Sequence, residues 1–213
     1  MTRLFARVVR VAERQWGVVA DWQLLRCGVS RPAISRWVVS ERLHRIYPRV
    51  YAVGHRALAT EGQLLAAVLY AGPGAALSHA SAAHWWELLP YVPDTTNVTS
   101  PKRRRSLDGV CVHSAERLER VMHRGLPVTP VARTLLDFAS VATLERVRLA
   151  VAEADFKHRL DLEAIDAVAG VGRAPPTSTG RSTFTVPSTP APGARSRIAS
   201  STCAESTVSR CPR

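Results

Sequence analysis

Apolar and polar positions alternate differently in three successive regions of the chain. Residues 1–54 contain short helical periods broken by turns, and residues 55–170 combine longer helical periods with short strand-like alternation. Residues 171–213 show neither period. The pattern predicts an α+β protein with one domain over residues 1–54, a small mixed α/β domain over residues 55–170 and a disordered tail over residues 171–213.

The segment ADWQLLRCGVSRPAISRWVVSERL predicts two helices separated by a tight turn. Asp21 is expected to cap the first helix, and Gly28 supplies the turn that follows it. Ser30 suits the N-cap of the second helix, and Pro32 suits its first turn, where the missing N–H costs nothing. The second helix is expected over about residues 31–42.

This second helix is amphipathic when its residues are placed 100° apart. One face is expected to pack into the core and gathers Ile34, Trp37, Val38 and the aliphatic stem of Glu41. The opposite face is expected to remain free and carries Ser35, Arg36, Val39 and Ser40.

The stretch LHRIYPRVYAV predicts two short strands around residues 47–48. Apolar Leu43, Ile46, Val50 and Ala52 alternate there with polar or basic His44, Arg45 and Arg49. A basic strand pair directly after a helix pair is typical of a wing whose cations meet phosphates or the minor groove.

The second region carries the start signals of several helices. Thr60 and Gln63 have the spacing of a capping box before the apolar run LLAAVLYA, and Ser78 is placed to cap the next helix. Thr129 is expected to cap a further helix, TPVARTLLDFA, with Pro130 at its first position. ATLERVRLAVAEADF continues with apolar residues at helical spacing.

A strand pair is expected between these helices, formed by TTNVTS and GVCVH and joined by the turn PKRRRSLD. Residues 102–105 of the turn, KRRR, are predicted to form a solvated hairpin tip. A second phosphate contact at this tip is the alternative.

The composition of residues 171–213 does not support a core. Fifteen of the 43 residues are Ser or Thr, six are Pro, and six Arg accompany a single acidic residue, Glu205. Such a segment cannot bury enough apolar surface to offset the entropy of ordering it. When the codons of this segment are read one base out of register, they permit a sequence that is amphipathic and helical in period. A frameshifted tail is therefore the favoured hypothesis, and a natural disordered tail is the alternative.

Charge and cysteine content narrow the class of protein. The net charge is +12, with 29 Lys and Arg against 17 Asp and Glu, which points to an anionic partner such as nucleic acid. Four cysteines occur without C-x-x-C pairs. The N-terminal residues lack the unbroken apolar run of a signal peptide, and no segment has the length of a membrane span. A cytoplasmic protein without membrane contact is expected.

Helix pair, turn and strand pair together predict an N-terminal winged helix-turn-helix that binds double-stranded operator DNA. The arginines of residues 1–54 far outnumber its acidic residues Glu13, Asp21 and Glu41. Ser35, Arg36, Val39 and Ser40 are expected to face bases, and Arg31, Arg42, Arg45 and Arg49 to face phosphates, with Ser30 at the start of the reading helix. A helix pair with a merely solvated basic face is the alternative.

Four segments carry a resemblance to a known family: GVVADWQLL, GVSRPAISRWVVSERLHRIYPRVYAVGH, PGAALSHASAAHWWELL and GLPVTPVARTLLDFA. In this order, over about residues 10–165, they resemble successive motifs of the AbiEi-type antitoxins, the autoregulators of type IV toxin–antitoxin systems. The resemblance implies an N-terminal winged helix-turn-helix, an α/β antitoxin domain and a nucleotidyltransferase-like toxin as partner. Many actinobacterial relatives also carry a C-terminal domain like the very-short-patch-repair endonucleases.

Catalysis is not expected, and neither is a cofactor or metal ion. The one match to an acidic-x-Lys nuclease element, Asp155 and Lys157, falls at the end of a predicted helix without a partner carboxylate on a strand. His79, Ser81 and His84 on one short helix lack a third orienting group.

Arg133 and Asp137 stand at i and i+4 on TPVARTLLDFA. This spacing predicts an ion pair within the helix or a buried pair at a domain contact, and nothing in the sequence favours a catalytic role.

The sequence therefore favours a DNA-binding transcriptional autoregulator of antitoxin type. Two alternatives remain: a truncated relic of an endonuclease-fused protein, and an antitoxin module that acts mainly by binding a protein partner.

Overall fold

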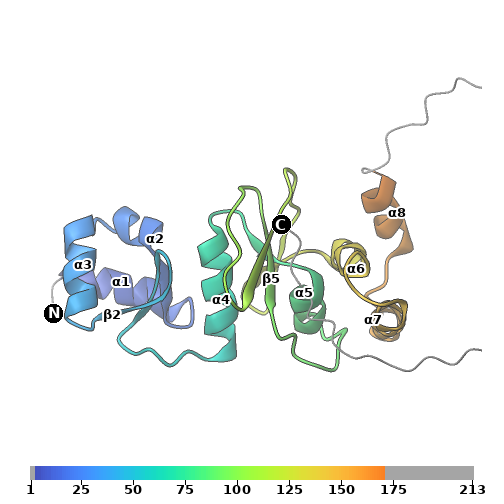
Figure 1. Cartoon of the computed structure of the whole chain (residues 1–213), viewed down its shortest axis with the longest axis horizontal. Coiled ribbons are helices and arrows are strands. Elements are labelled where there is room, and N and C mark those ends of the chain that lie inside the picture. The colour runs from blue at the N-terminus through green and yellow to red at the C-terminus, as the bar shows by residue number, and fades with distance from the viewer. Residues whose placement is uncertain (1–2, 171–213) are drawn as a thin grey trace, which may run out of the picture. The chain divides into compact units, whose positions relative to one another are not determined.

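The computed structural model describes residues 3–170 of the chain. Over these residues the protein forms eight helices, a three-stranded sheet and a five-stranded sheet (Figure 1). The predicted α+β class is therefore confirmed. The predictions of disorder and of a frameshift in residues 171–213 lie outside the described residues.

The first six elements of the described chain surround the three-stranded sheet. They are α1 (Arg3–Glu13), β1 (Val18–Ala20), α2 (Asp21–Arg26), α3 (Arg31–Val39), β2 (Leu43–Tyr47) and β3 (Val50–Val53). The strands are antiparallel in the order β1-β3-β2, with Val19 opposite Tyr51 and Arg45 on the other side of Tyr51. The two strands predicted around residues 47–48 are present, and β1 adds a third that the sequence analysis did not predict.

The turn between α2 and α3 has the predicted chemistry. Gly28 has a φ of +91°, a conformation that residues with a Cβ rarely adopt. The Ser30 hydroxyl accepts the Ala33 amide at 3.4 Å, and proline occupies the first turn of α3. Asp21 is not the cap of α2, because the cap position is Ala20, whose amide donates to the Gln23 side chain at 2.9 Å.

Helix α3 ends at Val39, three residues earlier than predicted. Glu41 follows with a φ of +55°, which breaks the helical path, and its side chain is exposed instead of packing through its stem. The Arg42 amide then donates to the Trp37 carbonyl at 2.9 Å and closes the last turn. Arg42 therefore lies outside α3.

The two faces of the three-stranded sheet pack against different partners. Val19, Leu43 and Tyr51 face the core shared by α1, α2 and α3. Val18 and Val50 instead belong to a core with helix α4 (Thr60–Ala71). A sheet with both faces covered by helices presents only its edges and turns to solvent.

The remaining elements form the five-stranded sheet and its helices. They are β4 (Ala76–Leu77), α5 (His79–Trp85), β5 (Thr96–Ser100), β6 (Val110–Ser114), β7 (Val121–His123), β8 (Leu126–Val128), α6 (Val131–Ala139), α7 (Leu144–Phe156) and α8 (Leu162–Gly170). The strand order is β6-β5-β4-β8-β7. Helix α7 matches the predicted ATLERVRLAVAEADF helix.

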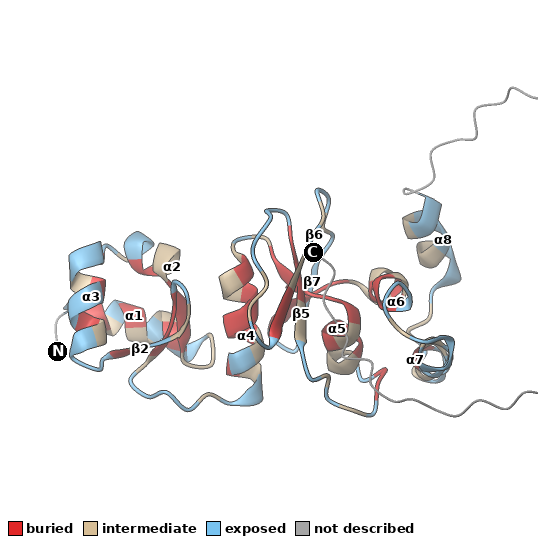
Figure 2. Ribbon diagram, viewed as in Figure 1, coloured by how far each residue is buried: buried red, intermediate tan, exposed pale blue. Residues whose placement is uncertain are grey.

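Helix α4 lies between the two sheets, as Figure 1 shows. Its buried side chains include Leu65, Ala66, Ala67 and Val68, which share one core with residues of both sheets. A helix packed on both sides needs no polar face. This position explains the uninterrupted apolar run LLAAVLYA, and Figure 2 colours much of α4 as buried.

The connection between β5 and β6 differs from the prediction. The two strands are parallel, with Thr96 opposite Val110 and Ser100 opposite Ser114. Residues 101–109 therefore form a crossover, because a hairpin turn joins only antiparallel strands. The expectation of a hairpin tip at residues 102–105 was wrong.

Of the caps predicted for α4, α5 and α6, only that of α5 lies at the expected residue, Ser78. Helix α4 has Ala59 at its cap position, and the Gln63 side chain donates to the Leu58 carbonyl at 3.1 Å instead of closing a capping box on Thr60. Ser78 occupies the cap position of α5 without a capping bond. Its hydroxyl accepts from the Thr99 hydroxyl at 2.8 Å.

The cap of α6 is displaced by one residue. Pro130 holds the cap position, so it precedes the helix instead of opening it. Thr129 is fully buried, and its hydroxyl lies 2.7 Å from that of Thr134. Buried hydroxyl pairing therefore takes the place of capping at Thr129.

Among the described helices, none combines the length and the apolar composition that crossing a bilayer requires.

Candidate nucleic-acid interface

Helix α3 presents a free outward face. Ile34 and Trp37 are buried, whereas Val39 exposes 85% of its surface and Ser35, Arg36 and Ser40 are all exposed. The predicted division of this helix into packed and free faces is thus present, except at Glu41. An aliphatic side chain so fully exposed next to Ser and Arg suits contact with base edges and thymine methyl groups.

The serine hydroxyls on and beside this face are oriented by the backbone. Ser35 Oγ donates to the Arg31 carbonyl at 3.3 Å, and Ser40 Oγ donates to the Trp37 carbonyl at 3.4 Å. Their oxygen lone pairs remain available as acceptors. Ser30 differs, because its oxygen already accepts the Ala33 amide as the helix cap.

Three arginines lie on or beside the outward face of α3. Arg31 is exposed at the first position of the helix, and Arg36 is exposed in its last turn. Arg42 follows the helix, with its guanidinium carbon 5.7 Å from the centre of the Phe5 ring. This cation–π contact positions Arg42 while its side chain remains exposed.

The turn between β2 and β3 is fixed by contacts with α2 on one side and α4 on the other. Arg49 has a φ of +65°, its carbonyl accepts the Asp21 amide at 2.8 Å, and its Nε lies 3.4 Å from Asp21 Oδ2. On the other side, the Tyr47 ring lies 5.9 Å from the Tyr70 ring of α4. Arg49 is therefore engaged in an ion pair, whereas Arg45 on β2 is exposed and has no salt bridge within the described residues.

Helix α1 and the residue that follows it carry a row of arginines that was not predicted to take part in binding. Arg3, Arg7, Arg10 and Arg14 recur at i, i+4, i+7 and i+11, and all four are exposed. We call these four residues the arginine ridge. The spacing alone was a sufficient signal, because it places Arg3, Arg7 and Arg10 on one face of α1, and Arg14 continues the row directly after the helix.

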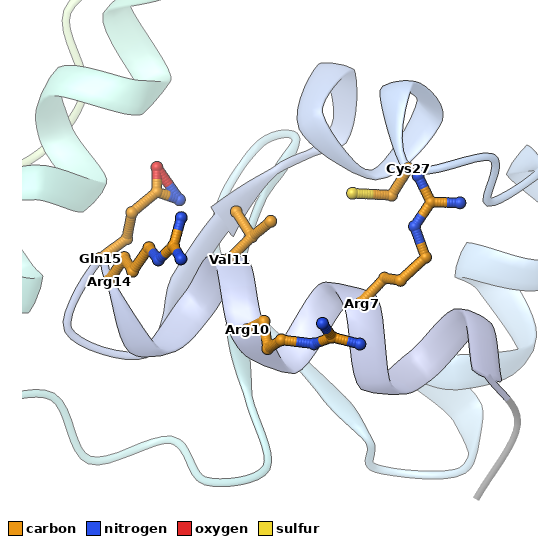
Figure 3. A pocket seen from close by; sticks show the side chains of 6 residues that line it. All are labelled: Arg7, Arg10, Val11, Arg14, Gln15 and Cys27. Atoms are coloured by element: carbon orange, nitrogen blue, oxygen red, sulfur yellow. The ribbon is translucent and has the colours of Figure 1, made fainter.

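An open pocket of about 450 Å³ borders the arginine ridge. It is lined by Arg7, Arg10, Val11, Arg14, Gln15 and Cys27. In Figure 3 the Arg10 side chain runs along α1, whereas the Arg7 side chain extends away from α1 towards Cys27 at the end of α2.

The histidines singled out in the second region do not form a nucleophile and base. The Ser81 hydroxyl accepts the Asn97 amide at 2.7 Å and lies 3.4 Å from the Thr95 carbonyl, so it joins α5 to the start of β5. His79 instead stacks on His113, with ring centres 3.7 Å apart, and its Nδ1 lies 2.9 Å from the Ser78 hydroxyl. Burial, with help from His113 and Arg133, lowers the pKa of His79 to about 3.

Arg133 and Asp137 form the expected ion pair within α6, with Nε 2.8 Å from Oδ1. Burial raises the pKa of Asp137, and the Arg133 charge and hydrogen bond oppose that shift. The second carboxylate oxygen, Oδ2, is buried without a hydrogen-bond partner in the described structure. The contact is a structural pair inside one helix.

The acidic-x-Lys element also takes the predicted position at a helix end. Asp155 lies in the last turn of α7 and is exposed, while Lys157 donates to the Glu87 carbonyl at 2.9 Å. Within residues 3–170, no group of three or more His, Cys, Asp or Glu side chains is arranged to hold a metal ion.

No family model matches the chain, and no curated protein matches it. A solved structure that resembles it is that of the RV2827C protein from Mycobacterium tuberculosis, with 17% sequence identity and a TM-score of 0.49 over 80% of this chain and 72% of that one.

Proposed function

We propose that this protein is a DNA-binding transcriptional regulator whose first six elements form a winged helix-turn-helix. The observation that carries the proposal is the outward face of α3, where an 85% exposed Val39 stands among exposed Ser35, Arg36 and Ser40. Ile34 and Trp37 of the same helix are buried in the core, so the opposite face is left in contact with solvent. Major-groove readers combine these residue types on a helix of this kind.

The order of elements supports the same function. A helix, a strand, two helices joined by a glycine turn and two antiparallel strands follow one another from α1 to β3. In winged helix-turn-helix domains the second helix of the turn enters the major groove and the strand pair lies beside it. Here the wing contact falls to Arg45, because Arg49 is paired with Asp21.

The wider role is proposed from the resemblance to AbiEi-type antitoxins. On that basis the protein represses its own promoter in the cytoplasm, lacks catalytic activity and has a nucleotidyltransferase-like toxin as its protein partner.

A binding experiment tests the proposal on the duplex upstream of the gene for this chain. Replacing Arg36 and Arg45 by Ala should weaken binding at least tenfold and reduce the slope of log K against log salt by about 1 to 2, since two cations leave the interface. Gel shift at several salt concentrations, with a shuffled duplex of equal length, measures both quantities.

Arg148→Ala is the matched control, because Arg148 is exposed on α7 far along the chain from the proposed interface. It should leave affinity and slope unchanged. Equal binding by wild type and the double Ala variant would contradict the proposed function.

A further inference from the structure

The arginine ridge is a strongly basic surface that the proposed operator contact does not use. Phe5, Val8 and Ala12 form the buried side of α1. At about 100° per residue, Arg3, Arg7 and Arg10 lie between about 140° and 200° from Phe5 around the helix, and Arg14 follows directly after its last residue, Glu13. The ridge is thus the side of α1 that points directly away from the core.

Within residues 3–170, the ridge is also free of competing ion pairs. No salt bridge among the described residues involves any of its four arginines, and the single acidic residue of α1, Glu13, is not paired with them. Adjacent members are separated by three or four residues, which is about 4.5 to 6 Å along the helix axis. Four guanidinium groups in a row, with no ion-pair partner in the described part of the chain, form an extended array of positive charge.

The pocket beside the ridge provides a concave site next to these positive charges. Arg7, Arg10 and Arg14 form one wall, and Cys27 at the end of α2 lies across from Arg7 (Figure 3). A phosphate oxygen entering this space would meet guanidinium donors from two successive turns of α1. Guanidinium groups bind phosphate oxygens in a bidentate manner.

The ridge points away from the part of the α3 surface that Ser35 and Val39 form. The Phe5 ring of α1 meets the Trp37 ring of α3 edge to face, with centres 5.1 Å apart, so the buried sides of the two helices face each other. The ridge lies opposite Phe5 on α1. Ser35 and Val39 likewise lie about 160° to 200° from Trp37 on α3. A straight duplex against α3 therefore does not reach the ridge.

We infer that the arginine ridge is a second binding surface for a nucleic-acid backbone, through which this protein bridges two DNA segments. The inference rests on the proposed function, because it takes the first segment to be the duplex at α3. A protein partner fits the ridge less well, since charged residues are depleted at the fully buried centre of protein interfaces. The pocket offers only Val11, Cys27 and aliphatic stems for such a centre.

A bridging experiment with the full chain tests the inference. The duplex upstream of the gene is fixed to beads, protein is added, and the capture of a second, fluorescent duplex of 30 base pairs is measured. Wild type should capture the second duplex. The triple variant Arg7→Gln, Arg10→Gln and Arg14→Gln should capture at least tenfold less, while its affinity for a single duplex changes less than threefold.

Two further variants control for charge and folding. Arg7→Lys, Arg10→Lys and Arg14→Lys together should retain most of the bridging, because the positive charges remain. Arg117→Gln, Arg120→Gln and Arg148→Gln remove the same net charge from exposed positions in the second region and should bridge like wild type. Thermal melting should show all three variants folded, since every changed side chain is exposed.

The outcomes separate this inference from the proposed function. If wild type binds one duplex and captures no second duplex, or if the Gln ridge variant bridges normally, the inference is overturned and the proposed function stands. It is also overturned if the ridge variant loses single-duplex affinity and salt dependence, because the ridge then contacts the same duplex as α3. If wild type binds no duplex at all, the proposed function fails together with the inference.

Discussion

At the scale of single residues, His79 combines a strained backbone with a buried ring. Its φ is +50° and it exposes 7% of its surface, with the ring stacked on His113 and close to Arg133. Burial lowers the pKa of both histidines, and that of His79 falls to about 3. Both rings are therefore neutral at pH 7, and the stack avoids the repulsion of two imidazolium ions.

This arrangement predicts loss of stability in acid. The unfolded chain takes up protons at these histidines below about pH 6.5, whereas folded His79 resists protonation until about pH 3. The contribution of His79 to the free energy of unfolding is complete above pH 6.5 and falls as the pH drops towards 3. Between pH 7 and pH 5 the free energy of unfolding should decrease by about 2 kcal/mol. Urea unfolding at a series of pH values measures this slope.

His79→Asn should flatten the slope over this range, because Asn does not titrate and tolerates positive φ. The control is His158→Asn, which also has a positive φ, +53°, but is exposed. A slope that is unchanged in His79→Asn would show that His79 is not responsible for the acid sensitivity.

At the scale of elements, the start of α3 depends on a local signal. Ser30 caps the helix through the Ala33 amide, and the preceding Gly28 makes the turn from α2 with its φ of +91°. Both features act within four residues of the helix start. Sequence analysis could therefore identify them without knowledge of the tertiary structure.

Ser30→Ala should destabilise the protein by about 1 kcal/mol, because the Ala33 amide loses its side-chain acceptor. Chemical denaturation measures the free energy of unfolding. Ser35→Ala on the same helix is the control and should change it by less than about 0.5 kcal/mol, since the Ser35 hydroxyl is exposed and caps nothing. Equal losses in the two variants would contradict the capping role of Ser30.

Other element boundaries could not be predicted because their capping is not local. Ala59 and Pro130 hold cap positions without any side-chain capping bond, while the hydroxyls of Ser78 and Thr129 pair with buried residues of β5 and α6. A Ser or Thr before an apolar run therefore marked a helix start only approximately. The identity of the capping residue depended on which hydroxyls the fold buried.

At the scale of the whole described chain, Trp16 joins the two predicted regions. Its carbonyl would lie 2.8 Å from a Cβ added at Gly62 in α4, and its ring would lie 2.4 Å from a Cβ added at Gly125 between β7 and β8. Trp16 also packs against the core that contains α4. Two glycines of the second region thus make room for one tryptophan of the first.

Gly125→Ala should cost about 2 kcal/mol beyond the cost of its positive φ, because the new methyl group overlaps the Trp16 ring. Gly109→Ala is the control for backbone strain, since Gly109 has a φ of +71° and nothing within 4 Å of an added Cβ. The difference in unfolding free energy between the two variants isolates the overlap. Trp16→Leu combined with Gly125→Ala should recover part of the loss, and purely additive effects would rule out the contact.

Local and periodic information in the sequence determined the α+β class, the glycine turn and cap before α3, the strand pair after it and the division of α3 into buried and free faces. These features depend on neighbours within a few residues, so periodicity and turn chemistry report them. The tertiary structure alone decided which distant segments meet. It made β5 and β6 parallel, placed α4 between two sheets, paired Arg49 with Asp21 and turned the arginine ridge away from α3. Such contacts follow from the burial of surfaces far apart in sequence, which no local pattern of residues records.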